Sequence, residues 1–198
     1  VFIEEGYFNL WQAEKILDAA TGHGLKVKIH ADELTNSGGT NLGLKMKAIS
    51  VDHLLCIDDE NISALGNSDT VAVLLPVTAF FLRKSYARAR DMLDKNVKIA
   101  IATDFNPGSS HCPSIQFAMW LALFGMKMSI GEVIKAVTLN AARAVDSETF
   151  IGSLEVGKRA DFIMLSSDNV NDLFYNLGVN IVEEVYISGE KVWQSTID

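Results

Sequence analysis

LKVKIHADE, residues 25–33, is the stretch that decides the fold. It opens with Leu25–His30, a run of β-forming residues that is nearly continuous in apolar side chains apart from two lysines. Such continuity is typical of a strand that is buried on both faces, as in a parallel sheet. The run ends at a histidine and is followed by two acids, so its polar chemistry lies at the carboxyl end of the predicted strand.

The same arrangement recurs along the first half of the chain. Further strand-like runs are Ala48–His53, Thr70–Leu75 and Val97–Thr103, with Val1–Glu4 as a shorter run at the start. Helical patterns separate them, at Leu10–Gly22, Asn41–Met46, Asp59–Leu65 and Tyr86–Lys95. This alternation predicts an α/β fold with a parallel sheet and right-handed crossovers. Both a barrel and an open doubly wound sheet fit the pattern.

The pattern changes after Pro113. Two helices are expected there, at Ser114–Lys127 and Ile130–Val145, with Ser129 and Glu132 forming a capping box at the start of the second. Three strands are expected further on, at Asp161–Leu165, Val182–Ser188 and Lys191–Gln194, the last two joined by a turn at Gly189-Glu190. We therefore predict two parts: residues 1–150 carry the α/β unit with the site, and residues 151–198 form a small β segment.

Composition excludes several classes of protein. The 198 residues carry a formal net charge of −8, so neither nucleic acid nor an anionic membrane surface is an expected partner. The longest apolar stretch, residues 117–126, is too short to span a bilayer. Cys56 and Cys112 lack close spacing, which fits a reducing cytoplasm better than a disulfide framework. The chain opens at Val1 inside a predicted strand, so we expect a piece of a longer, cytoplasmic protein.

Polar residues close four of the predicted strands on their carboxyl side. They are Glu4, His30, His53 and Asp104. In a barrel of parallel strands, the carboxyl ends all face one mouth, where active sites form. A histidine in this position can bind a divalent metal, as His30 would, and a carboxylate in the following loop, Glu33, can handle protons. The structural alternative for this pair is a core histidine beside solvated acids.

The other two strand ends add to this chemistry. His53 can act as a ligand or an acid–base group, or be a structural histidine bonded to Asp52. Asp104 would be costly to bury without a partner, for which a metal ion or helix N-terminal N–H groups would serve. The turn after it, Asn106–Ser109, offers backbone N–H groups to a carboxylate or carbonyl oxygen. Together these residues favour metal-assisted hydrolysis over a chance grouping.

Longer motifs carry a resemblance to a known family. The motifs are His30-Ala31-Asp32-Glu33, Val51-Asp52-His53-Leu54-Leu55, Thr103-Asp104-Phe105-Asn106-Pro107-Gly108, Thr138-Leu139-Asn140-Ala141-Ala142 and Gly152-Ser153-Leu154-Glu155. With them, the chain resembles the imidazolonepropionases of the amidohydrolase superfamily over nearly its whole length. The resemblance implies hydrolytic ring opening of 4-imidazolone-5-propanoate to N-formimidoyl-L-glutamate, in histidine degradation.

The resemblance also implies a fold and a set of roles. The fold would be the C-terminal part of a (β/α)8 TIM-like barrel, with a β-sandwich segment after it. His30 and Asp104 would bind one divalent metal, zinc or iron, and Glu33 and His53 would act on the substrate or its attacking water together with Asp104. Asn106, Gly108 and Ser109, beside Glu33, would bind the substrate. The full-length protein would be a cytoplasmic homodimer.

Departures from the family pattern limit these expectations. The family's His-x-His metal pair, its substrate-binding arginine and tyrosine, and a further histidine belong before Val1, and Val77 stands where a glycine is expected. We therefore expect this chain to hold about half of the site and to hydrolyse nothing alone. Two alternatives stay open: another metal-dependent amidohydrolase, such as a deaminase of a heterocycle, and a non-catalytic barrel relative.

Overall fold

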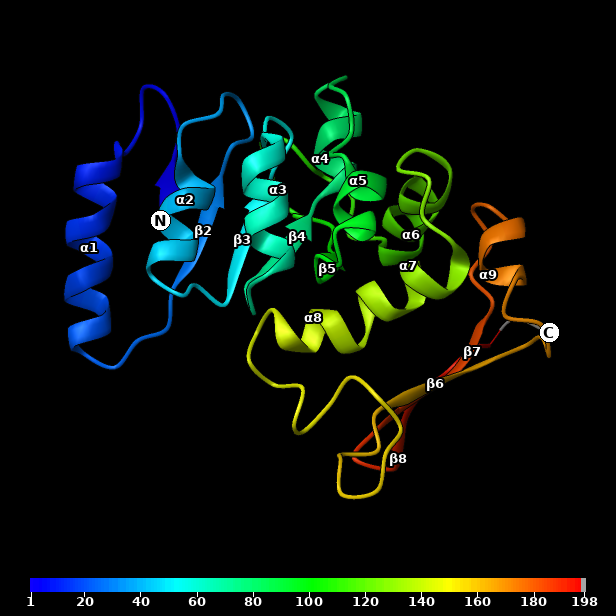
Figure 1. Cartoon of the computed structure of the whole chain (residues 1–198). Coiled ribbons are helices and arrows are strands. Elements are labelled where there is room, and N and C mark those ends of the chain that lie inside the picture. The colour runs from blue at the N-terminus through cyan, green and yellow to red at the C-terminus, as the bar shows by residue number, and fades with distance from the viewer. Residues whose placement is uncertain (197–198) are drawn as a thin grey trace.

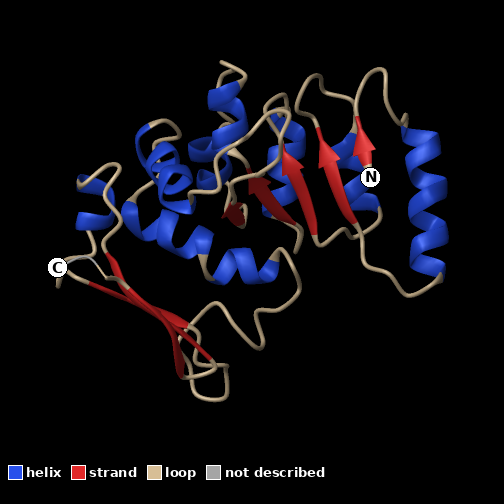
Figure 2. Cartoon of the chain, turned by 180° about the vertical axis from the view of Figure 1, so that it is seen from behind, coloured by secondary structure: helices blue, strands red, loops and turns tan. Residues whose placement is uncertain are grey.

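A parallel sheet forms the centre of the molecule. The computed structural model describes residues 1–196. The strands of this sheet are β1 (Phe2–Ile3), β2 (Lys28–Ala31), β3 (Ser50–His53), β4 (Val71–Leu74) and β5 (Ile99–Ile101). They lie in the order β1-β2-β3-β4-β5, so each strand pairs in parallel with the next strand of the chain. Figure 2 shows their arrows side by side, with all carboxyl ends at one edge. The predicted α/β class is confirmed.

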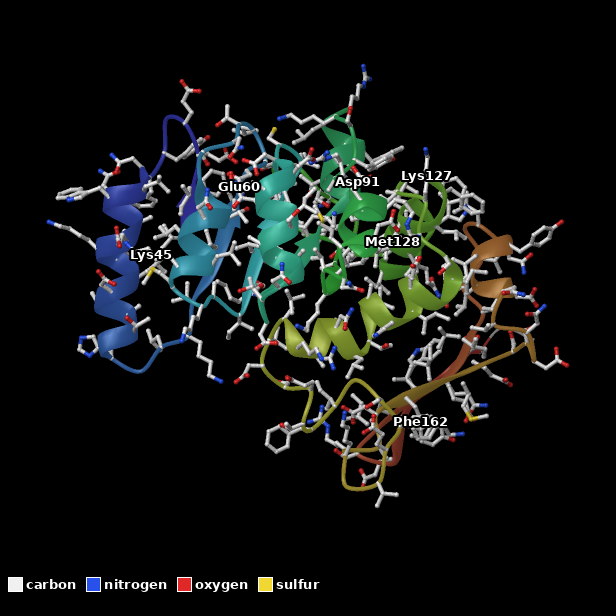
Figure 3. The ribbon with its side chains drawn as sticks, in the orientation of Figure 1. Lys45, Glu60, Asp91, Lys127, Met128 and Phe162 are labelled. Carbon is white, nitrogen blue, oxygen red and sulfur yellow. The ribbon has the colours of Figure 1, made fainter. Side chains whose placement is uncertain are left out.

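Helices pack around this sheet, mostly on one face, whereas Ala144, directly after the last of them, packs against Val71, Val73 and Ala100 on the other face. The helices are α1 (Leu10–Gly22), α2 (Gly39–Lys45), α3 (Asp59–Gly66), α4 (Pro76–Phe81), α5 (Ala89–Asp94), α6 (Ile115–Phe124), α7 (Ile130–Val137) and α8 (Leu139–Arg143). In Figure 1, α2 and α3 stand in front of β2 and β3, and α1 stands at the edge of the sheet, beside β1. The charged side chains of Lys45, Glu60 and Asp91 lie exposed on α2, α3 and α5 (Figure 3).

Alternate residues of each strand face opposite sides, which separates core from site. Ile29 and Val51 face the helices, where they belong to the main hydrophobic core. The helix α2 packs closely there, because a Cβ built on Gly43 would come 2.4 Å from the Val51 side chain. On the other face, the Lys28 ammonium donates to Ser50 Oγ at 2.7 Å, and that hydroxyl donates to Asp52 at 2.7 Å. His30 also lies on this polar face, next to Asp52 in the strand register.

The C-terminal segment forms a second, antiparallel sheet. Its strands are β6 (Phe162–Leu165), β7 (Val182–Ile187) and β8 (Glu190–Gln194), with the short helix α9 (Asp172–Tyr175) between β6 and β7. Figure 1 shows this sheet below α7 and α8, apart from the parallel sheet. The predicted division at residue 150 falls in the connection between α8 and β6, and it stays a prediction.

Three details differ from the expected elements. The helix expected over residues 130–145 is two helices, because Thr138 leaves helical geometry with φ −119° and ψ −93°. The hairpin turns at Ser188-Gly189, one residue earlier than expected, since both residues have the positive φ, +55° and +81°, that a type I′ turn requires. The helices α4 and α9 were not expected. The predicted capping box of Ser129 and Glu132 is confirmed.

Two further findings bear on the predictions from composition. Over residues 1–196, no helix has the length and apolar character that crossing a membrane would require. Cys56 and Cys112 are free thiols.

Candidate active site

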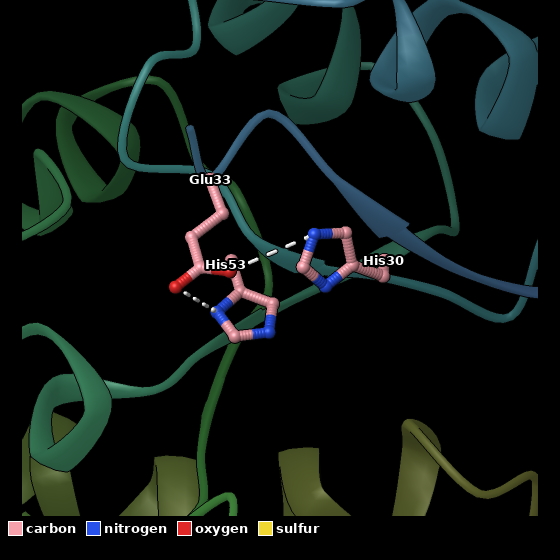
Figure 4. Close-up of side chains that lie close together, drawn as sticks. All are labelled: His30, Glu33 and His53. Atoms are coloured by element: carbon pink, nitrogen blue, oxygen red, sulfur yellow. Dashed lines mark ion pairs between the residues drawn. The ribbon is translucent and has the colours of Figure 1, made fainter. Parts of the chain in front are cut away.

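Three side chains gather at the carboxyl edge of the parallel sheet. His30 lies within β2, Glu33 in the loop after it, and His53 at the end of β3. Each offers one nitrogen or oxygen atom, and these three atoms all lie within 4.8 Å of one another. Figure 4 shows the Glu33 carboxylate beside the two imidazole rings, with a dashed line to a nitrogen of each. Parallel pairing of β2 with β3 produces this grouping, because it places the strand ends next to each other.

His30 presents an unpaired ring nitrogen. Its Nε2 is 3.3 Å from Glu4 Oε1 and 3.7 Å from Glu33 Oε2. Neither contact has hydrogen-bond geometry, so among the described residues this buried nitrogen has no hydrogen-bond partner. Burial lowers the pKa of His30, although the Glu4 carboxylate opposes that shift. The Phe2 ring stacks on the imidazole with 3.7 Å between centroids, which fixes the ring plane. A neutral imidazole held this way is suited to bind a metal ion.

Glu33 links the two histidines. Its second oxygen, Oε1, is 3.8 Å from Nδ1 of His53. The residue is 6% exposed, and burial raises the pKa of its carboxyl group above the ordinary value. A carboxylate whose pKa is raised toward neutrality is a better proton acceptor at physiological pH. The predicted role of Glu33 in proton transfer therefore has suitable chemistry, and it stays a prediction.

His53 adopts an unusual backbone conformation. Its φ is +81° and that of Leu54 is +62°, in the left-handed region that residues with a Cβ rarely adopt. The strand thus turns sharply at its last residue, with the ring aimed at Glu33 on one side and Asp104 on the other. Burial lowers the pKa of His53 to about 3, and the nearby His30 adds to the shift. His53 is therefore neutral at physiological pH.

Asp104 lies beside this cluster but outside its tightest grouping. Its Oδ2 is 4.0 Å from His53 Nε2 and accepts a 2.7 Å hydrogen bond from the buried hydroxyl of Thr78. The predicted metal pair of His30 and Asp104 remains a prediction, because the compact ligand set within the described residues is His30, Glu33 and His53. Sequence reasoning gave Thr78 no role in the site.

The turn after Asp104 is organised by its own asparagine. Asn106 Oδ1 accepts hydrogen bonds from the backbone N–H groups of Gly108 and Ser109, both at 2.8 Å. Its Nδ2 donates to the Asp104 carbonyl at 2.6 Å. An anion that binds to these N–H groups would have to displace the Asn106 oxygen. The substrate-binding roles of Asn106, Gly108 and Ser109 stay predictions.

Two buried acids shape the loop that follows β2. Asp32 has no exposed surface and accepts hydrogen bonds from Ser37, Gly39 and Thr40, including a 2.6 Å bond from the Thr40 hydroxyl. Glu4 is 3% exposed, and its carboxylate accepts a hydrogen bond from the backbone N–H of Glu33. Sequence reasoning assigned neither residue a role in the site, although Glu4 was placed at a strand end. Both are structural anchors for the loop.

The low pKa of His53 predicts loss of stability in acid. The unfolded chain binds this proton near the ordinary pKa of 6.5, but the folded chain binds it only near about 3. The stabilising contribution is thus complete above pH 6.5 and is lost as pH falls toward 3. Between about pH 7.5 and about pH 5.5, the loss for this one group is about 1.3 kcal/mol.

Urea unfolding of metal-free protein at the two pH values measures this effect. The variant His53→Gln is expected to lose about 1.3 kcal/mol less over the same interval than the unsubstituted protein does. The matched control is His23→Gln, since His23 is exposed at the end of α1 and should leave the acid loss unchanged. Equal acid sensitivity of His53→Gln and the unsubstituted protein would contradict the prediction.

Comparison with known proteins adds to this geometry. Residues 11–192 match the model of the amidohydrolase family. The chain is 45% identical over 192 residues to the imidazolonepropionase of Treponema denticola, and 46% identical over 192 residues to that of Desulfotalea psychrophila. These alignments cover 96% and 97% of this chain but 46% of each relative, so the chain spans about half the length of the curated relatives it matches. The resemblance predicted from the sequence motifs is confirmed.

The fold is also similar to that of solved enzymes. The structure of an adenosine deaminase from Xanthomonas campestris with bound zinc matches with a TM-score of 0.77 at 19% sequence identity. That match covers 93% of this chain and 50% of the deaminase. At this identity the likeness concerns the fold alone, and it agrees with the predicted partial barrel.

Proposed function

Because the chain belongs to the amidohydrolase family, we propose that it carries part of the active site of an imidazolonepropionase. Such an enzyme adds water to 4-imidazolone-5-propanoate and opens the ring to N-formimidoyl-L-glutamate, in histidine degradation. The observation that carries this proposal is the cluster of His30, Glu33 and His53 at the strand ends. Its support comes from the relatives of that name, which are about 45% identical over nearly the whole chain.

The proposal includes one divalent metal ion, zinc or iron. The residues fit such an ion: His30 Nε2 is buried and unpaired among the described residues, and burial keeps His53 neutral. We propose His30 and Asp104 as ligands, with Glu33 and His53 beside them. When bound, the ion would supply an activated water and would polarise the carbonyl that is attacked.

The chain's own residues would then handle the proton and the substrate. Glu33 would accept a proton from the attacking water, because burial raises its pKa toward that task. His53, 3.8 Å from Glu33, would assist the transfer toward the ring nitrogen that leaves. Asp104 is held by Thr78, so its oxygen is fixed in place. The turn of Asn106, Gly108 and Ser109 would contact the propanoate or the ring.

Two wider proposals accompany this function. The partner is a small molecule and not a nucleic acid, which agrees with the net charge of −8. The full-length protein would be a cytoplasmic homodimer, and the free thiols of Cys56 and Cys112 are consistent with a reducing compartment.

The experiment uses this chain alone and a chimera. In the chimera, the chain replaces the matching part of the Treponema denticola relative. We expect the chimera to convert 4-imidazolone-5-propanoate to N-formimidoyl-L-glutamate, detected by mass spectrometry, and the chain alone to show no turnover. The physical reason is that the described residues supply five parallel strands, too few to surround a substrate as a closed barrel of eight does.

A substrate panel separates this proposal from its rivals. A deaminase of a heterocycle would release ammonia from an amino-substituted ring and leave the imidazolone intact. A non-catalytic relative would convert nothing and would bind no transition metal in either form. Turnover by the chain alone would contradict the expectation that it holds half of a site.

A further inference from the structure

One buried carboxylate next to the site has no part in the proposed reaction. Glu4 directly follows β1, and its side chain has no exposed surface. A buried carboxylate is costly unless hydrogen bonds or opposite charges stabilise it. Its partners therefore indicate what the residue does.

Both oxygens of Glu4 accept hydrogen bonds from the loop that carries Glu33. Oε1 accepts from the backbone N–H groups of Glu33, at 2.6 Å, and Leu34, at 3.0 Å. Oε2 accepts from the Thr35 backbone N–H, at 3.3 Å, and from its hydroxyl, at 3.5 Å. Hydrogen bonds to an ionised acceptor are shorter and stronger than those between neutral groups. Three successive residues, starting with Glu33, are thus tied to the neighbouring strand.

The same oxygen also faces the other side of the site. Oε1 is 3.3 Å from His30 Nε2, and the register pairs Phe2 and Ile3 with His30 and Ala31. Glu4 is therefore the first residue beyond this pairing, opposite the start of the loop. From there one carboxylate oxygen contacts both the peptide of Glu33 and the ring of His30.

We infer that Glu4 is a positioning residue, which holds the Glu33 side chain at a fixed place relative to the His30 ring. The inference rests on the proposed function, because Glu33 must lie within reach of a reacting proton. Misplacement of a catalytic group by about 1 Å can lower a rate by about 10²-fold. In Glu4→Gln, one of the two accepting oxygens becomes an N–H donor, so either the Glu33 and Leu34 amides or the Thr35 amide loses its acceptor.

The first test measures the loop without any substrate. In the chimera, Glu4→Gln is expected to raise the hydrogen-exchange rates of the Glu33, Leu34 and Thr35 amides by about 10-fold or more, because their acceptor is weakened. Exchange in the core strands β3 and β4 should stay unchanged. The matched control is Glu5→Gln, which changes the neighbouring exposed carboxylate and should leave residues 33–35 as they are.

The second test measures catalysis. Loss of an outer partner of a metal-site residue typically costs about 10–100-fold, and we expect a fall of that size in kcat for Glu4→Gln, with KM within about threefold of the unsubstituted chimera. A purely structural role would lower the yield of folded protein and leave kcat per folded molecule unchanged. If Glu4→Gln does not fold, Glu4→Asp replaces it, because that variant keeps the charge and shortens the reach by one methylene group.

The outcomes separate the two proposals. Unchanged exchange at residues 33–35 would overturn the inference about Glu4, and so would faster exchange with unchanged kcat. An unsubstituted chimera without turnover would contradict the proposed function, whereas the exchange measurement needs no substrate and would still decide whether Glu4 holds the loop.

Discussion

Glu33→Gln is expected to lower kcat of the chimera by about 10²–10⁴-fold, the range that general acid–base groups contribute. Glutamine preserves the size of the side chain but cannot accept a proton from water. The metal content should stay near that of the unsubstituted chimera if Glu33 acts on the proton. Steady-state kinetics and elemental analysis of the same samples measure the two quantities.

The pH profile gives a second view of Glu33. Burial raises the pKa of its carboxyl group, so the acid limb of kcat/KM should lie above the ordinary value of 4.5. The residual activity of Glu33→Gln should lack this limb. Glu60→Gln is the matched control, because Glu60 is an exposed carboxylate in the first turn of α3 (Figure 3) and has no part in the proposed site. If Glu33→Gln keeps the kcat of the unsubstituted chimera, Glu33 does not transfer a proton in the reaction and this part of the proposal is wrong.

His30→Asn is expected to remove the metal along with the activity. The unpaired Nε2 of His30 is lost in this variant, and the asparagine side chain is too short to reach the same position. Loss of a residue that only supports a metal ligand typically lowers metal affinity by about 10–100-fold. Because His30→Asn removes a ligand itself, the apparent metal affinity should fall by more than that. Competition with a chromophoric chelator measures this affinity. His23→Asn, an exposed histidine at the end of α1, serves as control.

The same titration distinguishes two ligand sets. If Asp104 is a ligand, as the family resemblance implies, Asp104→Asn should weaken metal binding as strongly as His30→Asn does. If the compact cluster binds the ion instead, Glu33→Gln and His53→Gln should weaken it and Asp104→Asn should not. Full metal binding by His30→Asn would contradict both.

Hydrophobic patterning was sufficient to predict the parallel sheet. Continuous apolar runs such as Ala48–His53 identify strands buried on both faces, and α1 begins and ends at the predicted residues. Parallel strands place their carboxyl ends at one edge of a sheet, and this was enough to predict that His30 and His53 lie close together. These successes share a cause, because each depends on residues close in sequence or on the shared direction of parallel strands.

The remaining features depend on contacts between distant residues. Thr78 donates to Asp104 across 26 positions, and Glu4 accepts from Glu33 across 29. Nothing in the local sequence marks such pairs. The break at Thr138 also escapes periodicity, since residues 130–145 keep a helical pattern across it. The sequence therefore predicted the candidate site residues better than it predicted the residues, such as Thr78 and Glu4, that hold them in position.

Strand order has a consequence for how the molecule folds. Since β1 to β5 pair in chain order, each new strand finds its partner edge already made by the preceding one. The contacts are between residues such as Lys28 and Ser50, only 22 positions apart, so loop closure stays short. The pairing of this sheet therefore depends on contacts between neighbouring βα units and not on contacts between the two ends of the chain. The contact between Glu4 and the loop of Glu33 likewise joins two strands that are neighbours both in the chain and in the sheet, so it needs no residue beyond that loop.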